Sequence, residues 1–253
     1  MSNGATPWQD LIAQAAGERP ASINAHTFNK KWGTASQPAL LECDDGSMYV
    51  VKGKQNRRMI ANEQIVAHLG RLLAAPVPEV AYVDVPQELI ARQPQLAHFQ
   101  AGVGHGSEFV TDCGDAVGIQ YVDGENKPRF AKLAVLYGWV FPQNQQFIYE
   151  MAAPHLVYST DHGHFFPNGP DWTPAHLPQA GVATPDQALV GPCHLSQDEL
   201  RTAAAPLVGL QDQAIARAVA APLDEWGIAM DDRVAVATYL ARRRGEILAA
   251  LGL

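Results

Sequence analysis

The chain has 253 residues, of which 47% are apolar and 17% are charged, so it can bury a sizeable core and is not intrinsically disordered. Its 18 basic and 26 acidic residues give a formal net charge of −8, which argues against a general nucleic-acid coat, because phosphate contact needs clustered lysine and arginine. No stretch approaches the roughly 18 uncharged apolar residues of a membrane span, and the first residues lack the apolar run of a secretory signal.

The N-terminal third predicts a β-rich unit. Residues 1–20 indicate an extension with a short helical turn. Residues 39–43 and 47–52 are β-rich runs on either side of Asp44-Asp45-Gly46, a pattern typical of a hairpin. A helix follows, because apolar residues recur on one helical face before Pro76; they are Ile65, Val66, Leu69, Leu72 and Leu73. Residues 80–85 predict a further strand.

The remainder of the chain predicts mostly helix. Residues 130–141 form an apolar helix candidate, and residues 155–160 indicate a short strand that leads into Asp161. Residues 167–194 are rich in proline, glycine and polar residues, which predicts a long irregular loop. Two helices are expected at about residues 197–219 and 231–251. We therefore expect an α+β fold in which a small β-rich lobe precedes a larger helical lobe.

Two further motifs favour ordinary structural roles. The glycine-rich run at residues 102–106 does not lead from a strand into a helix, so it indicates a flexible loop rather than a dinucleotide site. The basic triplet Arg242-Arg243-Arg244 is typical of a solvated helix face. The sequence contains no GxSxG motif, which argues against a serine hydrolase.

Three charged residues point to phosphate chemistry. Lys52 ends an otherwise apolar strand, and Glu63 lies near the start of the next helix, where its carboxylate can hold the lysine ammonium against phosphate oxygens. The plainer alternative is a solvated lysine and a glutamate favoured by a helix N-terminus. Asp161, followed by His162 and Gly163, suits a hard cation such as magnesium, although aspartate and glycine also make ordinary turns.

Histidines in the same region offer a competing hypothesis, a metal-dependent enzyme. A transition-metal site is conceivable from the side chains of His155, His162, His164, His176, Asp161 and Asp171. The chain contains neither an HExxH nor a CxxC motif, and histidines on the surface or in the core are the plainer interpretation.

The order of these motifs resembles the HipA-like kinase family of bacteria, a compact branch of the protein-kinase-like fold. The resemblance spans about residues 22–250. It rests on short motifs, which are Tyr49-Val50-Val51-Lys52, Ala61-Asn62-Glu63, the LLAAPVPE run at residues 72–79, Thr160-Asp161-His162-Gly163-His164 and Pro222-Leu223-Asp224-Glu225-Trp226. It implies a bilobal fold, with an extension at residues 1–20, a nucleotide-binding β-rich N-lobe at residues 21–110 and a mainly helical C-lobe at residues 111–253.

The resemblance also implies roles for matching residues. Lys52 is expected to contact the α- and β-phosphates of ATP, Glu63 to orient that lysine, and Asp161 to hold magnesium. The backbone at Glu108, Phe109 and Val110 is expected to form the hinge beside adenine, and residues 33–37 the loop over the phosphates.

One departure from the family concerns the catalytic loop. The family places an aspartate, and five positions later an asparagine, between the apolar helix and the magnesium-binding aspartate. Here Asn144 aligns with the catalytic aspartate and Tyr149 with the asparagine, and residues 141–149 contain no carboxylate. An amide does not accept a substrate proton, so we expect weakened catalysis. Glu150, beside the vacated ligand position, is a candidate replacement ligand for the metal.

These observations predict a protein that binds ATP and magnesium and transfers a phosphoryl group, with weakened or altered catalysis, to a hydroxyl of an unknown protein or small molecule. A pseudokinase-type interaction module without catalysis is the first alternative, and the histidine-based metal enzyme is the second. Cys43, Cys113 and Cys193 form neither a zinc pattern nor a disulfide framework, which favours the cytoplasm.

Overall fold

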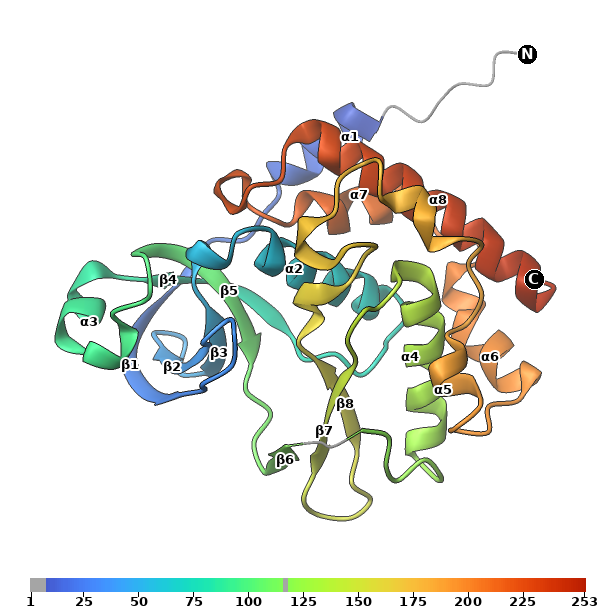
Figure 1. Cartoon of the computed structure of the whole chain (residues 1–253), viewed down its shortest axis with the longest axis horizontal. Coiled ribbons are helices and arrows are strands. Elements are labelled where there is room, and N and C mark those ends of the chain that lie inside the picture. Colours follow the sequence, from blue (N-terminus) through green and yellow to red (C-terminus); the bar gives the residue numbers. More distant parts are fainter. Residues whose placement is uncertain (1–7, 116–117) are drawn as a thin grey trace.

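The structure is a computed structural model that describes residues 8–115 and 118–253. A β-barrel built from the N-terminal part of the chain lies on one side, and a largely helical part lies on the other (Figure 1). Helix α2 (Arg58–Leu72) runs between them (Figure 1). The predicted α+β architecture, β-rich first and helical second, is confirmed.

The barrel is a closed sheet with strand order β1-β2-β3-β5-β4. Its strands are β1 (Ile23–Lys31), β2 (Ala39–Cys43), β3 (Met48–Lys52), β4 (Val80–Val85) and β5 (Gly102–Glu108). Neighbouring strands are antiparallel except for β1 and β4, whose parallel pairing of Ile23 with Val83 closes the barrel. A second sheet follows, with the order β6 (Cys113–Asp115), β7 (Gln146–Glu150) and β8 (Val157–Thr160).

The predicted hairpin between β2 and β3 is confirmed. Gly46 has a φ of 81°, a conformation that glycine adopts without steric cost, and its amide donates to the Cys43 carbonyl at 3.0 Å. The Asp45 carboxylate accepts from the Ser47 amide at 2.9 Å, which closes the turn. At its other edge β3 pairs with β5, where Lys52 lies opposite His105.

The glycine-rich run at residues 102–106 is a strand and not a loop, so that prediction is wrong. It belongs to β5, which pairs with both β3 and β4. A Cβ on Gly104 would lie 2.6 Å from the Lys52 carbonyl oxygen, and one on Gly106 would lie 2.5 Å from Val83. The glycines therefore permit close packing inside a small barrel, a requirement that local sequence does not reveal.

Helix α2 has almost no free face. The side chains from Ile60 to Ala67 are all buried, because the helix packs against β5 on one side and against helix α7 on the other. This burial includes the polar residues Asn62, Glu63 and Gln64. The apolar stripe predicted for this helix is present, but it is only part of the buried surface.

The helical part consists of α4 and the C-terminal helices, with two short helices elsewhere. The helices besides α2 are α1 (Trp8–Ala16), α3 (Gln87–Arg92), α4 (Asn126–Val140), α5 (Gln187–Val190), α6 (Gln197–Ala204), α7 (Asp212–Ala220) and α8 (Met230–Leu251). The single helix predicted at residues 197–219 is broken, since Pro206 lies in a 3₁₀ turn and Gly209 has a φ of 75°. The predicted irregular segment at residues 167–194 contains only short helical turns.

The N-terminal segment and the basic triplet both pack more closely than the sequence indicates. Helix α1 lies against α7 and α8 and buries Trp8 and Ile12. Arg243 is buried and donates hydrogen bonds to the carbonyls of Gly138, Trp139 and Gly181, so the prediction of a solvated triplet is wrong at this position. No helix in the described residues is long and apolar enough to cross a membrane.

Candidate functional site

A cavity of about 330 Å³ lies where the barrel, α2 and the second sheet meet. Its lining includes Lys52, Glu63, Asp161 and the three hinge candidates Glu108, Phe109 and Val110. Residues that are more than 100 positions apart in the chain therefore face one space. Asn144 and Glu150 are not among the described residues that line it.

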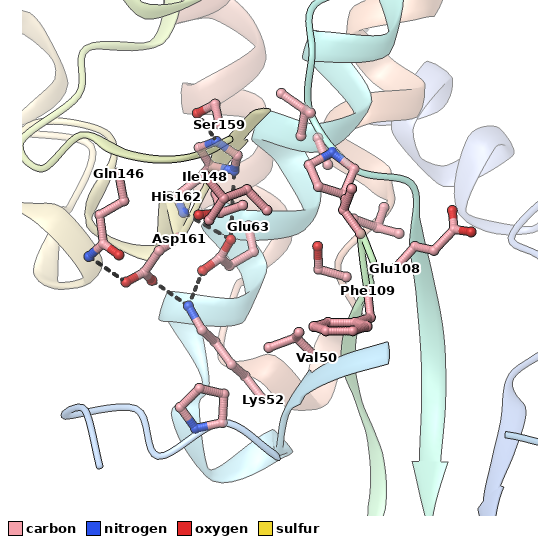
Figure 2. A pocket seen from close by; sticks show the side chains of 18 of the residues that line it. Val50, Lys52, Glu63, Glu108, Phe109, Gln146, Ile148, Ser159, Asp161 and His162 are labelled. Carbon is pink, nitrogen blue, oxygen red and sulfur yellow. Dashed lines mark hydrogen bonds and ion pairs between the residues drawn. The ribbon is translucent and has the colours of Figure 1, made fainter. Parts of the chain in front are cut away.

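Lys52 is the centre of a buried charge cluster. Its Nζ forms ion pairs with Glu63 Oε1 and Asp161 Oδ1 (Figure 2). The side chains of Lys52 and Glu63 are 8% and 5% exposed, whereas that of Asp161 is 27% exposed. The aspartate is thus the member of the cluster that is open to a ligand.

Local backbone geometry brings Asp161 to the lysine. The residue follows β8 and has a φ of 60°, in the left-handed region, at the start of the 3₁₀ turn η3 (His162–His164). The amide of His162 donates to Glu63 Oε2 at 2.9 Å, so the same glutamate binds both Lys52 and the backbone beside Asp161. Gln146 Nε2 donates to Asp161 Oδ2 at 2.9 Å from the start of β7 (Figure 2).

Electrostatics keep this cluster charged. Burial works to lower the pKa of Lys52, but Glu63 and Asp161 outweigh it and raise that pKa. For Glu63, burial works in the opposite sense, yet the adjacent Lys52 ammonium lowers its pKa below the ordinary value. Lys52 and Glu63 are therefore a buried ammonium and a buried carboxylate at neutral pH.

His162 joins the cluster to helix α4. Its Nε2 lies 2.7 Å from Ser159 Oγ, which in turn bonds the Tyr137 hydroxyl of α4. Burial lowers the pKa of His162, which favours a neutral ring. The histidine is thus a satisfied core residue that supports the backbone beside Asp161.

Asn62 fastens α2 to the segment after Asp161. This fully buried amide donates to the carbonyls of Gly163 at 2.9 Å and Phe165 at 3.1 Å, and its Oδ1 accepts from Trp172 Nε1 at 2.9 Å. Arg58 of the same helix donates to the Trp172 carbonyl at 2.8 Å and lies over its ring. Glu63 and Asp161 are therefore held together by the backbone that carries them and not only by their charges.

The opposite end of the cavity is apolar. Val50 and Phe109 lie there, and the exposed Glu108 side chain points away from them (Figure 2). Ile148 of β7 adds further apolar lining to the cavity. The amides of Glu108 and Phe109 already donate, to the Glu79 carbonyl at 2.8 Å and the Met48 carbonyl at 2.9 Å. The roof comes from the turn between β1 and β2, since Trp32, Thr34, Ser36 and Pro38 also line the cavity.

The sequence alignment places Tyr149 at the position of the family's asparagine. Tyr149 points away from Asp161, because its hydroxyl donates to the Gly118 carbonyl and accepts from the Gln120 amide. The residue that faces Asp161 is Gln146, which the sequence reasoning did not single out. No local signal marks Gln146: it faces Asp161 because it begins β7 and pairs with Thr160, immediately before Asp161.

The predicted metal ligand Glu150 is not brought to the site. It ends β7, four residues beyond Gln146, and its carboxylate accepts from the Tyr158 hydroxyl at 3.0 Å. Four strand residues span about 13 Å. This separation is too large for the side chains of Gln146 and Glu150 to bind one cation together with Asp161. Asn144 lies in the loop before β7 with its side chain exposed.

The histidine-based metal site is not formed in the described part of the chain. No group of three histidine, cysteine or acidic side chains there could hold a metal ion. His155 stacks on Tyr121 with 4.3 Å between the ring centroids, while His162 forms a hydrogen bond with Ser159. The two imidazole rings therefore have different partners. His164 lies beside Gly169 and His176 bonds Thr173.

Comparisons with known proteins settle the family. Residues 27–161, more than half of the chain, match the sequence profile HipA_2, described as HipA-like kinase. This chain belongs to the HipA-like kinase family. The matched range begins in β1 and ends at Asp161, so it includes Lys52 and Glu63.

The fold agrees with a solved kinase. The crystal structure of the Helicobacter pylori proinflammatory kinase CtkA is similar to this chain with a TM-score of 0.59. The similarity covers 91% of this chain and 96% of that chain, at 12% sequence identity. At this identity the likeness establishes the kinase-like fold alone. No curated protein matches this chain.

Proposed function

We propose that this HipA-like protein binds ATP in the cavity, with the phosphates at Lys52 and the base at residues 108–110. The observation that supports the proposal most directly is the contact of Lys52 with both Glu63 and Asp161 on one cavity wall. An ammonium held by a buried carboxylate is fixed in position and can move from Asp161 to a phosphate oxygen without leaving Glu63.

The apolar end of the cavity suits a purine base. Val50 and Ile148 supply apolar surface, and the roof over residues 32–38 encloses the phosphate side. Because the amides of Glu108 and Phe109 are engaged, the Glu108 carbonyl and the Val110 amide are the backbone groups that we assign to the base edge. Together they offer one acceptor and one donor.

The donor set beside the phosphates fits one magnesium ion. The Asp161 carboxylate and the Gln146 side-chain carbonyl are hard oxygen ligands, and magnesium usually adds phosphate and water oxygens to one or two such protein ligands. Gln146 presents its N–H to Asp161, so its amide turns over when it ligates. The cation, when bound, neutralises phosphate charge.

The same geometry supports slow phosphoryl transfer to a hydroxyl. Residues 141–149 place no carboxylate next to Asp161, and loss of a positioned base typically lowers the rate by about 10² to 10⁴. Positioning and charge neutralisation by Lys52 and Asp161 remain available. The acceptor is a hydroxyl of a protein or small molecule.

A second candidate function is nucleotide binding without transfer, in a pseudokinase-type interaction module. The observation that favours it is the loop itself, in which Asn144 is exposed and neutral. The two functions share the binding site and differ only in turnover.

Calorimetric titration with ATP and magnesium tests the shared part of the proposal. We expect binding at micromolar to millimolar nucleotide, and weaker binding by the Asp161→Asn variant in magnesium. Absence of binding at millimolar nucleotide overturns both functions. Phosphate release or acceptor labelling that disappears in Asp161→Asn distinguishes the kinase from the pure binding module.

A further inference from the structure

The turn at residues 32–38 lies beyond the last pair of the ladder between β1 and β2, and it lines the cavity. Inside the turn, the Trp32 amide donates to the Pro38 carbonyl at 3.0 Å. The Gln37 amide donates to the Thr34 carbonyl, also at 3.0 Å. These bonds shape the turn but do not fix where it lies relative to the cavity. That position depends on contacts with other segments of the chain.

His98 supplies such a contact through both nitrogens of its ring. Its Nε2 lies 2.9 Å from the Gln37 carbonyl oxygen, and its Nδ1 lies 3.5 Å from Lys31 Nζ at the end of β1. A carbonyl only accepts a hydrogen bond and an ammonium only donates one. The partners therefore assign the proton of this contact to Nε2, which donates to Gln37, while Nδ1 accepts from Lys31.

The segment that carries His98 is itself fixed to the barrel. It connects β4 to β5 and contains α3, which lies against β1 (Figure 1). The His98 ring packs edge-to-face on Phe99, with 4.7 Å between the ring centroids. The residues of this connection that are buried in the barrel core are Leu89, Ile90, Leu96 and Phe99. His98 is therefore a firm point to which the turn is bound.

The backbone of Gln37 benefits from this bond. Its φ of 44° lies in the left-handed region, which residues with a side chain rarely adopt. A hydrogen bond to the carbonyl of the same residue stabilises that conformation. A second contact to the turn, from Asn56 Nδ2 to the Ser36 carbonyl, is longer at 3.4 Å and hence weaker. His98 thus makes the shorter of these two side-chain bonds to the turn.

We propose that His98 is a positioning residue for nucleotide phosphates, which acts by holding the turn at residues 32–38, through Gln37, over the phosphate end of the cavity. The inference rests on the proposed nucleotide binding, in which this turn encloses the phosphates. It goes beyond that proposal because it gives a role to the connection between β4 and β5. Residues 86–101 of this connection are not among the described residues that line the cavity.

Calorimetric titration with ATP and with adenosine separates positioning of the phosphates from binding of the base. In the His98→Ala variant we expect the Kd for ATP to rise about three- to tenfold, the usual effect of one lost hydrogen bond. The Kd for adenosine, which has no phosphates, should stay constant and reports that the variant is folded. An unchanged Kd for ATP, or an equal loss for both ligands, overturns the inference.

Two conservative variants identify the atom that acts. His98→Gln places an amide N–H about as far from the backbone as Nε2, so it should restore the wild-type Kd for ATP. His98→Asn places its amide at the shorter distance of Nδ1, which does not reach the Gln37 carbonyl, so it should bind ATP as weakly as His98→Ala. Equal Kd values for the glutamine and asparagine variants contradict the assignment of Nε2.

Hydrogen exchange in the ligand-free chain tests the same contact without nucleotide. The amides of Trp32 and Gln37 should exchange faster in His98→Ala and at the wild-type rate in His98→Gln. The control is His26→Ala, which removes an exposed histidine of β1 and should leave both amides unchanged. Unchanged exchange at residues 32–38 in His98→Ala overturns the inference. Failure of the wild-type chain to bind ATP removes the proposed function instead, and faster exchange then still shows that His98 holds the turn.

Discussion

The two sides of the cavity differ in how firmly their polar side chains are bound by neighbouring residues. On the side of α2, Lys52, Glu63 and Asp161 are joined by ion pairs, and Asn62 binds the backbone that follows Asp161. On the side of the catalytic loop, Asn144 is exposed, and the neighbouring glutamines bond two different aspartates, Asp186 and Asp161.

This contrast separates two tasks of a kinase-like fold. Anchoring phosphate needs a fixed cation, and the α2 side provides one in a buried network. Activating an acceptor needs a proton-accepting group in the loop, and residues 141–149 provide only amides as polar side chains near the start of β7. Nucleotide binding and transfer are therefore expected to respond to different substitutions.

The largest effect is expected from Lys52→Ala. The variant removes the ammonium that we assign to the phosphates and leaves the buried Glu63 carboxylate without its cation, which typically costs about 3–5 kcal/mol of folding stability. We expect nucleotide binding to be undetectable by calorimetry and the urea midpoint to fall. The matched control is Lys127→Ala, which removes a partly exposed lysine on α4.

A double variant separates folding from binding at this position. Lys52→Met with Glu63→Gln leaves no unpaired charge in the core, so most of the lost stability should return while nucleotide binding does not. Retained nucleotide affinity in this variant contradicts the assignment of Lys52 to phosphate.

The next largest effect is expected from Asn144→Asp, which adds the carboxylate that the loop lacks. If this position is the catalytic one, ATP turnover with an acceptor should rise by about 10² or more, the usual contribution of a positioned base. Gln145→Asp is the control, because Gln145 bonds Asp186 and not Asp161. An equal rise in both variants, or none at Asn144, shows that the position is not catalytic.

A smaller effect is expected from Asn62→Asp. The change keeps the acceptor for Trp172 but places a carboxylate against the Gly163 and Phe165 carbonyls, so stability should fall by about 2–3 kcal/mol. Nucleotide affinity should fall as well, because Asp161 loses its fixed backbone. Hydrogen exchange that accelerates at residues 161–172 more than elsewhere supports this role, whereas uniform acceleration contradicts it.

The smallest effect concerns acid stability. Burial lowers the pKa of His68 and of His105 to about 4, and lowers that of His162. As the pH falls, the unfolded chain therefore takes up protons before the folded chain does. The contribution of these histidines to the free energy of unfolding is complete above about pH 6.5 and is lost as the pH falls towards 4.

Substitution of one histidine tests this assignment. Urea titrations between pH 7 and 4 should show a shallower decline for His105→Gln, which can still bond Gln64. The exposed His26→Gln should retain the wild-type slope. An unchanged slope in His105→Gln contradicts the contribution of that ring.

Much of the cluster formed by Lys52, Glu63 and Asp161 could be predicted from the sequence. Lys52 at a strand end and Glu63 on the next helix follow from hydrophobic patterning and a hairpin turn, and both are local signals. Their meeting with Asp161 was expected only from the resemblance to HipA-like kinases, since 109 residues separate Lys52 from Asp161. The structure brings all three together.

The remaining features depend on tertiary contacts. Gln146 was missed because counting along the chain placed the metal ligand at Tyr149, whereas strand pairing with Thr160 determines which residue faces Asp161. The strand at residues 102–108 looked like a loop because only a narrow barrel requires its glycines. Arg243 looked solvated because its carbonyl partners lie more than 60 residues away in the chain.

Helix α2 carries one more consequence for the biology of this fold. A helix enclosed by the barrel on one flank and by α7 on the other exposes apolar surface whenever it tilts, at roughly 25 cal/mol for each Å². Switching the protein off by swinging this helix outward is therefore costly. A signal that controls the protein has an easier target in the turn at residues 32–38, which lines the cavity and belongs to no packed helix.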